Sequence, residues 1–134
     1  MTSGSRLASL LVALSLAAFA TSGHAQSTAF HRTTLQDQDF PPPSRHTVTM
    51  KAVVDPGGEV PPHTHPGLEM GYVVQGQATL IIKGQPGRPL AAGDSFAVPP
   101  HTVHRVKNAG SGPLTMVSTY VVDKGQPVAS PAAW

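Results

Sequence analysis

The chain has 134 residues, of which 40% are hydrophobic and 12% are charged, a composition that fits one globular domain with a single core. Its net charge of +2 is spread along the sequence and only 5% of its residues are aromatic, so we expect no nucleic-acid-binding surface. It contains no cysteine, which excludes disulfides, thiolate metal ligands and a cysteine nucleophile.

The first 25 residues have the pattern of a secretory signal peptide. Arg6 precedes an apolar run over residues 7–20, and small and polar residues follow this run up to Ala25. The run is shorter than the ~18 residues that cross a bilayer, so we expect cleavage after Ala25 and no stable membrane anchor. A periplasmic or secreted protein is therefore predicted, with an uncleaved, membrane-tethered form as the alternative.

Residues 26–45 form a segment that has no obvious place in a minimal β-domain. It contains three consecutive prolines at positions 41–43. We interpret the segment as an N-terminal arm that pairs with an edge strand, either of the same chain or of a second subunit.

Residues 46–122 have the pattern of an all-β barrel. Short β-branched runs alternate with Gly- and Pro-rich turns, and no stretch has a long helical period. We predict strands at residues 46–54, 69–75, 77–83, 94–98, 104–108 and 114–122. Their close spacing leaves no room for crossover helices, so antiparallel sheets closed into a barrel or jelly roll are expected, followed by a C-terminal tail at residues 123–134.

The sequence His63-Thr64-His65, with Glu69 four residues further on, is a candidate metal site. Residues two apart on an extended backbone share a face, so both imidazoles are predicted to point inward from one strand. Glu69 has the same parity. Prolines on both sides restrict the backbone and would hold the imidazoles in a fixed relation. By itself a His-x-His pair fits polar residues on a loop equally well.

His104, at the start of a later predicted strand, supplies a third imidazole. A barrel brings sequence-distant strands together, so three nitrogens and one carboxylate can converge inside it. Such a set leaves positions free for water, substrate or dioxygen on an octahedral ion.

With these residues in place, the chain resembles the cupin superfamily over residues 46–122. The first cupin motif is matched in every spacing by Gly57, His63, His65, Glu69 and Gly76. The second motif is matched by Gly93, Pro99, His104 and Asn108, and departs from the family at His101, which stands in place of a glycine. Histidine tolerates a positive φ better than most residues, so this departure concerns the turn and leaves the ligand set whole.

The resemblance implies a single double-stranded β-helix (jelly-roll) barrel with His63, His65, Glu69 and His104 as metal ligands. Iron, manganese, nickel, copper and zinc all accept such ligands, so the sequence leaves the metal open. Small cupin barrels commonly pair, and with the unplaced arm this leads us to expect a homodimer. Gly57, Gly76 and Gly93 are assigned to turns, and Asn108 to capping one.

The sequence predicts the metal site more specifically than it predicts the function. The family includes dioxygenases, lyases, isomerases and non-enzymatic binders. The barrel strands carry almost no other Asp, Glu, Lys or Arg, so we expect the metal to perform the chemistry, with Glu69 as the catalytic group. The apolar strands favour a small aromatic or hydrophobic substrate.

A metal-dependent dioxygenase is therefore our first hypothesis. A metal-dependent isomerase or lyase is the alternative, and the hydroxyl of Tyr72 or Tyr120 pointing at the metal would support it. A non-catalytic binder of a metal or small ligand is a third possibility. Tyr72, Tyr120, Met50, Met116 and Phe96 are expected to be barrel packing, any of which can line the pocket.

Overall fold

The computed structural model describes residues 30–40 and 44–134, so the predicted signal peptide lies outside the described residues. The described residues form ten strands and no helix. The strands are β1 (Phe30–Phe40), β2 (Arg45–Val54), β3 (Glu59–Thr64), β4 (Leu68–Gln75), β5 (Gln77–Ile82), β6 (Arg88–Ala91), β7 (Ser95–Val98), β8 (His104–Asn108), β9 (Leu114–Asp123) and β10 (Ser130–Pro131). Within these residues, no helix is long and apolar enough to cross a membrane.

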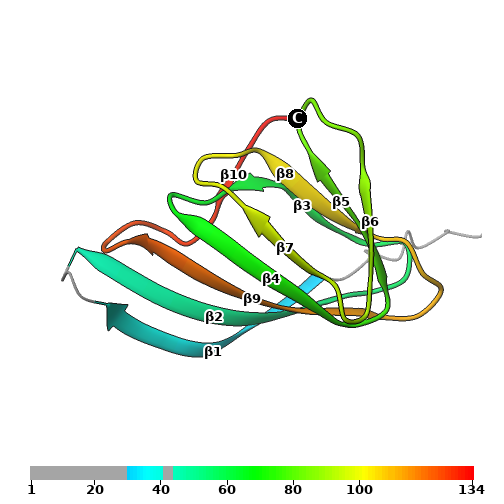
Figure 1. Cartoon of the computed structure of the whole chain (residues 1–134), viewed down its shortest axis with the longest axis horizontal. Helices are drawn as coiled ribbons and strands as arrows, with labels where there is room; N and C mark the ends of the chain where they lie inside the picture. The colour runs from blue at the N-terminus through cyan, green and yellow to red at the C-terminus, as the bar shows by residue number, and fades with distance from the viewer. Residues whose placement is uncertain (1–29, 41–43) are drawn as a thin grey trace, which may run out of the picture.

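The strands form two five-stranded sheets that face each other, with orders β1-β2-β9-β4-β7 and β10-β3-β8-β5-β6 (Figure 1). Every strand pair is antiparallel. Strands that follow one another along the chain often lie in different sheets, as β3 and β4 do, so the two sheets are connected repeatedly. The predicted all-β jelly-roll fold is confirmed.

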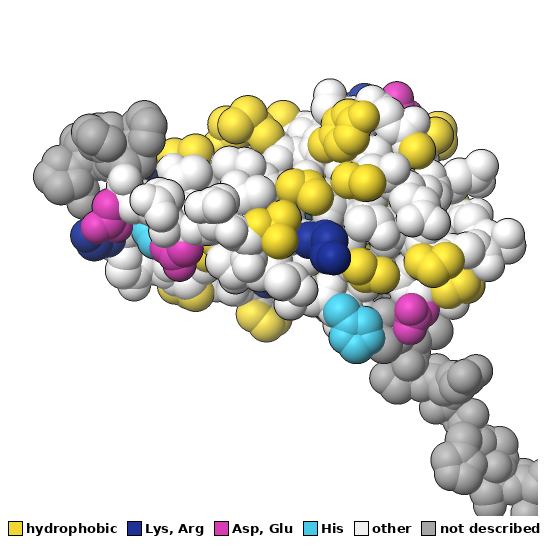
Figure 2. Space-filling view, turned by 90° about the horizontal axis from the view of Figure 1, so that it is seen from below, with side chains coloured by type: hydrophobic (Ala, Val, Ile, Leu, Met, Phe, Trp, Pro, Cys, Tyr) yellow, Lys and Arg dark blue, Asp and Glu magenta, His cyan; other side chains and the backbone are white. Residues whose placement is uncertain are grey.

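Period-two alternation places one face of each sheet in a shared core. On β9, every second residue from Leu114 to Val122 is buried. The inner faces of both sheets contribute to one hydrophobic cluster, whose buried members are Val54, Val60, Val73, Ala78, Leu80, Leu90, Phe96, Val98, Val106, Leu114 and Met116. Outside this core, Figure 2 shows charged side chains scattered singly or in small groups among hydrophobic and neutral ones.

The six predicted strands are present with ends that agree to within one residue. Two strands inside the predicted barrel, β3 and β6, were missed because both contain proline, which we had assigned to loops. In β3 the pairing with β8 shifts register between Val60 and His63, where Pro61 and Pro62 have no N–H to donate. β6 lies at the edge of its sheet, where proline is tolerated.

The predicted N-terminal arm and C-terminal tail both contain strands. β1 pairs along its length with β2 of the same chain, with one register irregularity between Thr34 and Gln36. β10 pairs with β3, so the end of the chain closes the opposite edge of the other sheet. Each sheet therefore has one edge formed by a terminal segment of the described chain, β1 in one sheet and β10 in the other.

Candidate metal centre

The first two histidines lie at the end of β3. His63 is the partner of His104 across the β3–β8 ladder, so these two side chains share the inner face of one sheet. His65 follows the last residue of β3, and its carbonyl accepts a 2.8 Å hydrogen bond from the amide of His101. The turn around His101 therefore fixes the backbone from which the His65 side chain extends.

Glu69 comes from the opposite sheet, at the start of the strand predicted at residues 69–75. The chain turns between Thr64 and Leu68, and Glu69 lies on β4 between Tyr120 of β9 and Val98 of β7. The parity argument therefore does not apply across this turn. The inward direction of Glu69 follows instead from the alternation within β4, in which Glu69, Gly71 and Val73 are buried.

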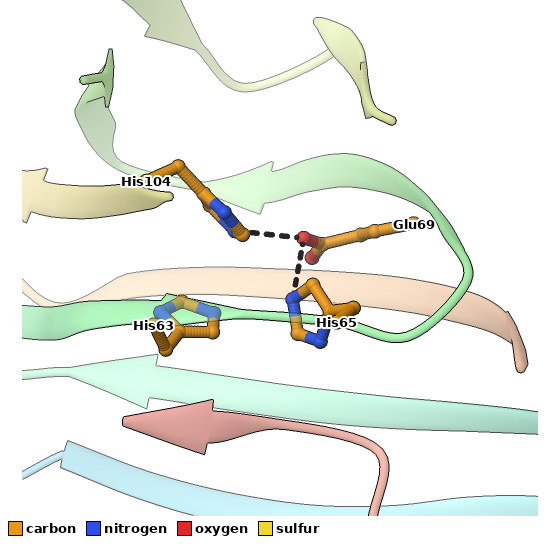
Figure 3. Close-up of side chains that lie close together, drawn as sticks. All are labelled: His63, His65, Glu69 and His104. Carbon is orange, nitrogen blue, oxygen red and sulfur yellow. Dashed lines mark hydrogen bonds and ion pairs between the residues drawn. The ribbon is translucent and has the colours of Figure 1, made fainter. Parts of the chain in front are cut away.

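The four side chains nevertheless converge inside the fold. One ligand atom from each of His63, His65, Glu69 and His104 lies within 4.8 Å of the other three, and all four residues are buried (Figure 3). The ring of His63 lies 4.2 Å from that of His104 and 4.7 Å from that of His65, measured between centroids. A buried cluster of this composition calls for a charge or ligand that satisfies it.

Backbone carbonyls hold all three imidazoles in the same tautomer. The Nδ1 atoms of His63, His65 and His104 lie 2.7, 2.7 and 2.9 Å from the carbonyl oxygens of Pro61, Val128 and Thr102. A carbonyl oxygen only accepts, so each Nδ1 carries a proton and donates it, and each neutral ring has its lone pair on Nε2. This is the arrangement in which an outer hydrogen bond orients a metal-ligating histidine.

The centre of the cluster fits a cation. Oε2 of Glu69 lies 3.1 Å from the Nε2 of His65 and 3.1 Å from that of His104. When both nitrogens present lone pairs, three acceptors face one another with no donor between them, and only a positive charge satisfies them. His65 Nε2 is also buried without a hydrogen-bond partner in the part of the chain described here. A proton on an imidazole can supply that charge in the free protein, and a divalent ion can supply it in a metal complex.

Tyr120, on β9, contacts the candidate ligand Glu69. Its hydroxyl donates a 3.0 Å hydrogen bond to Oε1 of Glu69, and its ring lies 4.6 Å from that of His65. Oε1 is thereby engaged, which leaves Oε2 for the imidazoles. The predicted packing role of Tyr120 omitted this contact, because spacing within residues 114–122 gives the face of a side chain but not its polar partner.

The electrostatics of the site follow from burial and from these contacts. Burial, with His104 as the next cause, lowers the pKa of His63 from 6.5 to about 4, so this imidazole is neutral at neutral pH. Burial by itself raises the pKa of the Glu69 carboxyl, but the interactions with His104 and His65 outweigh it and hold that pKa well below its usual range. Burial, followed by the Glu69 carboxylate, raises the pKa of Tyr120 above its ordinary value.

Three of the remaining predicted residues lie outside the cluster: two of them shape turns and one is exposed on the surface. His101 has a φ of 59° and is the one non-glycine residue with positive φ in the described part of the chain, as the substitution at a glycine position predicted. The buried Asn108 bonds to the carbonyls of Val54 and Gly112 and accepts from the amide of Gly110, so it does cap a turn. Tyr72, by contrast, points outward on β4 and is exposed.

Comparisons with known proteins agree with this geometry. The family model described as a cupin domain matches residues 50–120. A rhicadhesin receptor from Pisum sativum is 36% identical over 70 residues, which are 48% of this chain and 32% of the receptor. The chain thus spans about a third of the length of that curated relative.

Solved structures show the same fold. A protein with a double-stranded β-helix domain from Klebsiella pneumoniae superposes with a TM-score of 0.66 at 23% identity, covering 78% of this chain and 85% of the other. Oxalate decarboxylase from Bacillus subtilis, a protein with Mn(II) centres, superposes with a TM-score of 0.56 at 26% identity, covering 63% of this chain and 23% of the other.

Proposed function

We propose that this chain, which belongs to the cupin family, binds a divalent transition metal through His63, His65, Glu69 and His104. The observation that carries the proposal is the buried convergence of three imidazoles, each with its Nδ1 hydrogen bonded to a carbonyl, on one carboxylate oxygen. Nitrogen and oxygen ligands of this kind suit iron, manganese, nickel, copper and zinc. The Mn(II) centres of the oxalate decarboxylase relative support manganese as one of the first metals to test.

We propose further that the metal-loaded protein is a dioxygenase acting on a small, largely hydrophobic compound. The bound ion supplies Lewis-acid and redox chemistry at the site. Glu69 is the carboxylate that lines this cavity and is ionised at neutral pH, so it is our candidate for the group that accepts a proton from a substrate there. Tyr120 holds Glu69 in position, and Phe96, Val106 and Met116 line the cavity and exclude water.

A metal-dependent lyase or isomerase is the second candidate, and Tyr120 is the observation that favours it. Its hydroxyl points into the site and lies within hydrogen-bond reach of the ligand set. Its raised pKa keeps the hydroxyl protonated at neutral pH, so we propose it as the group that donates a hydrogen bond to a substrate oxygen in such a reaction. A non-catalytic metal-binding role is the outcome left if neither chemistry is found.

Metal content of purified variants tests the binding proposal. His63→Ala, His65→Ala and His104→Ala should each weaken metal affinity by more than the roughly 10–100-fold that loss of an outer hydrogen-bonding partner costs. Glu69→Gln keeps size and one oxygen donor but removes the charge, so it should reduce activity more than metal content. His31→Ala, an exposed histidine on β1, is the matched control and should retain full occupancy. Full occupancy in both His63→Ala and His104→Ala would contradict the proposal.

Oxygen uptake separates the enzymatic hypotheses. Protein loaded with iron, manganese, nickel or copper is mixed with aromatic diols or flavonols while dissolved oxygen is recorded. Consumption that depends on both metal and substrate supports a dioxygenase. Substrate turnover without oxygen uptake supports a lyase or isomerase, and no turnover with any of the four metals supports a binder.

Export and self-association complete the proposed role. We propose that the chain is exported with cleavage after Ala25, for which the intact mass of the secreted protein is the test.

We also propose a homodimer, supported by four exposed apolar side chains on the outer face of β4: Leu68, Met70, Tyr72 and Val74. A monomer by light scattering at tens of micromolar would contradict it.

A further inference from the structure

The N-terminal strand brings a positive charge to the metal cavity. Arg32 lies on β1 directly opposite Ala52 of β2, and Phe30 lies opposite Val54. Directly opposed residues point to the same face, and Val54 is fully buried while Ala52 packs against the core. Phe30 and Arg32 therefore extend from the inner face of the sheet at its open edge.

Two neighbouring cavities share these side chains. The inner cavity, about 20 Å³, is lined by Arg32 together with Glu69, His63, His104 and Tyr120. The outer cavity, about 270 Å³, is lined by Phe30 and Arg32 of β1 and by residues at or beside the opposite edge: Val60, Pro61, Pro62, His63, Ala129, Ser130 and Pro131. We call this outer cavity the vestibule. It lies between the β1 edge of one sheet and the β3–β10 edge of the other, and Arg32 and His63 border both spaces.

Arg32 lacks an acidic partner in the part of the chain that the structure describes. Among the described residues, no carboxylate forms an ion pair with it, and its one recorded side-chain contact is with the ring of Phe30, 5.2 Å from the guanidinium carbon. Its charge still borders the site, because Arg32 and Tyr120 line the same inner cavity. An unpaired guanidinium at the mouth of a largely apolar cavity is suited to recognise a planar anion.

We propose that Arg32 binds the carboxylate of a small organic acid whose apolar body lies in the vestibule. The vestibule is near the lower end of the about 300–1,000 Å³ of known ligand pockets, so the acid must be small. Its lining is mostly proline, valine, alanine and phenylalanine, which suits a hydrocarbon or aromatic body. The single positive charge of Arg32 neutralises a monocarboxylate. It would leave a phosphate dianion with an unbalanced negative charge, which the ionised Glu69 nearby would repel.

The inference rests on the proposed function in one respect. The Glu69 carboxylate in the inner cavity repels an anion unless a metal ion offsets its charge, so the acid should bind more tightly to the metal-loaded protein than to the metal-free one. Arg32 contributes a contact that is independent of the metal, which allows the two ideas to be tested separately.

Calorimetric titration with benzoate, and with benzamide as its neutral isostere, tests the proposal. The wild-type protein should bind benzoate more tightly than benzamide. Arg32→Gln should weaken benzoate binding by roughly 10–100-fold, the range for a hydrogen bond to a charged group, and leave benzamide unchanged. Arg32→Lys should lie between them, because lysine keeps the charge but not the two-pronged geometry. Arg88→Gln, on the exposed edge strand β6, is the matched control and should bind as wild type does.

Each result decides one of the two proposals. Equal benzoate affinity in Arg32→Gln and wild type, tighter binding of inorganic phosphate than of benzoate, or no benzoate binding by wild type at millimolar concentration would overturn the role of Arg32. Metal content of Arg32→Gln should equal that of wild type. If wild type takes up no metal but its benzoate binding still depends on Arg32, the metal proposal fails and the carboxylate site stands.

Discussion

The hydrogen bond from Tyr120 to Glu69 gives a sharp test of how the metal centre is supported. Tyr120→Phe removes one hydroxyl and leaves the ring that packs beside His65. Both partners are buried, Tyr120 with 6% and Glu69 with 5% of their surface exposed, so water cannot replace the lost donor at Oε1. A hydrogen bond to a charged group is worth about 1.5–3 kcal/mol, and the unsatisfied carboxylate oxygen adds to the loss.

We therefore expect the free energy of unfolding of the metal-free Tyr120→Phe variant to fall by about 1.5–3 kcal/mol. Metal affinity should also fall by roughly 10–100-fold, as for other partners that orient a ligand from behind. Urea unfolding of the metal-free protein and competitive metal titration measure the two quantities. Tyr72→Phe is the control, since it removes a hydroxyl on the outer face of β4, away from Glu69, and keeps the aromatic ring that the proposed dimer would bury, so it should change neither.

The two measurements together identify the role of the hydroxyl. Loss of stability with unchanged metal affinity would make Tyr120 a purely structural residue. If Tyr120→Phe and Tyr72→Phe behave alike in both assays, the contact seen in the structure does not support Glu69, and the account of how Oε2 is directed at the imidazoles is wrong.

Three further predictions concern the groups around the site. The free energy of unfolding of the metal-free protein should fall by about 3 kcal/mol as the pH falls from 6.5 to about 4, because His63 binds a proton in the unfolded chain but stays neutral in the folded one. Urea unfolding at several pH values measures this loss, and His63→Ala should reduce it. Gly71→Ala would place its β-carbon 2.1 Å from the ring of Phe96, so we expect a loss of about 1–3 kcal/mol or more, and a smaller one in the Phe96→Ala background; equal losses in the two backgrounds would contradict the clash. Asn108→Ala removes three hydrogen bonds at about 1 kcal/mol each, and should lower the melting temperature while metal per folded chain stays unchanged; an unchanged melting temperature would show that the capping contacts are weak.

The four residues of the candidate metal site were predictable because their signal is local. His63, His65, Glu69 and His104 occupy fixed spacings within two short motifs, and the structure brings all four together. The reason given for Glu69 was wrong, because a turn separates it from the histidines. The motif holds even so, since it encodes two strands from opposite sheets and the turn that joins them, and the number of residues in that turn sets which side chain of β4 points inward.

The boundaries of proline-containing strands were not predictable from propensity. Pro61 and Pro62 argue against a strand, yet β3 tolerates them at a register shift, where a ladder hydrogen bond is already missing. The backbone carbonyls that orient the imidazoles are also beyond sequence reasoning. One of them, that of Val128, lies 63 residues from the His65 it orients, in a segment predicted to be a tail. Only the folded arrangement shows that the C-terminal segment supports the metal centre.

The charge inside the cavity depends on the N-terminal arm, which the sequence analysis could not place in the barrel. The strands at residues 46–122 contribute an apolar lining, which led to the expectation of a small aromatic or hydrophobic substrate. The structure pairs β1 with β2 in a register that sets Arg32 opposite Ala52, and this places a guanidinium beside the histidines. A shift of one residue in that register would turn Arg32 to the outer face and leave His31 or Thr33 in its place. The charge of the ligand that we propose therefore depends on how the arm pairs with the barrel, which no motif within the barrel encodes.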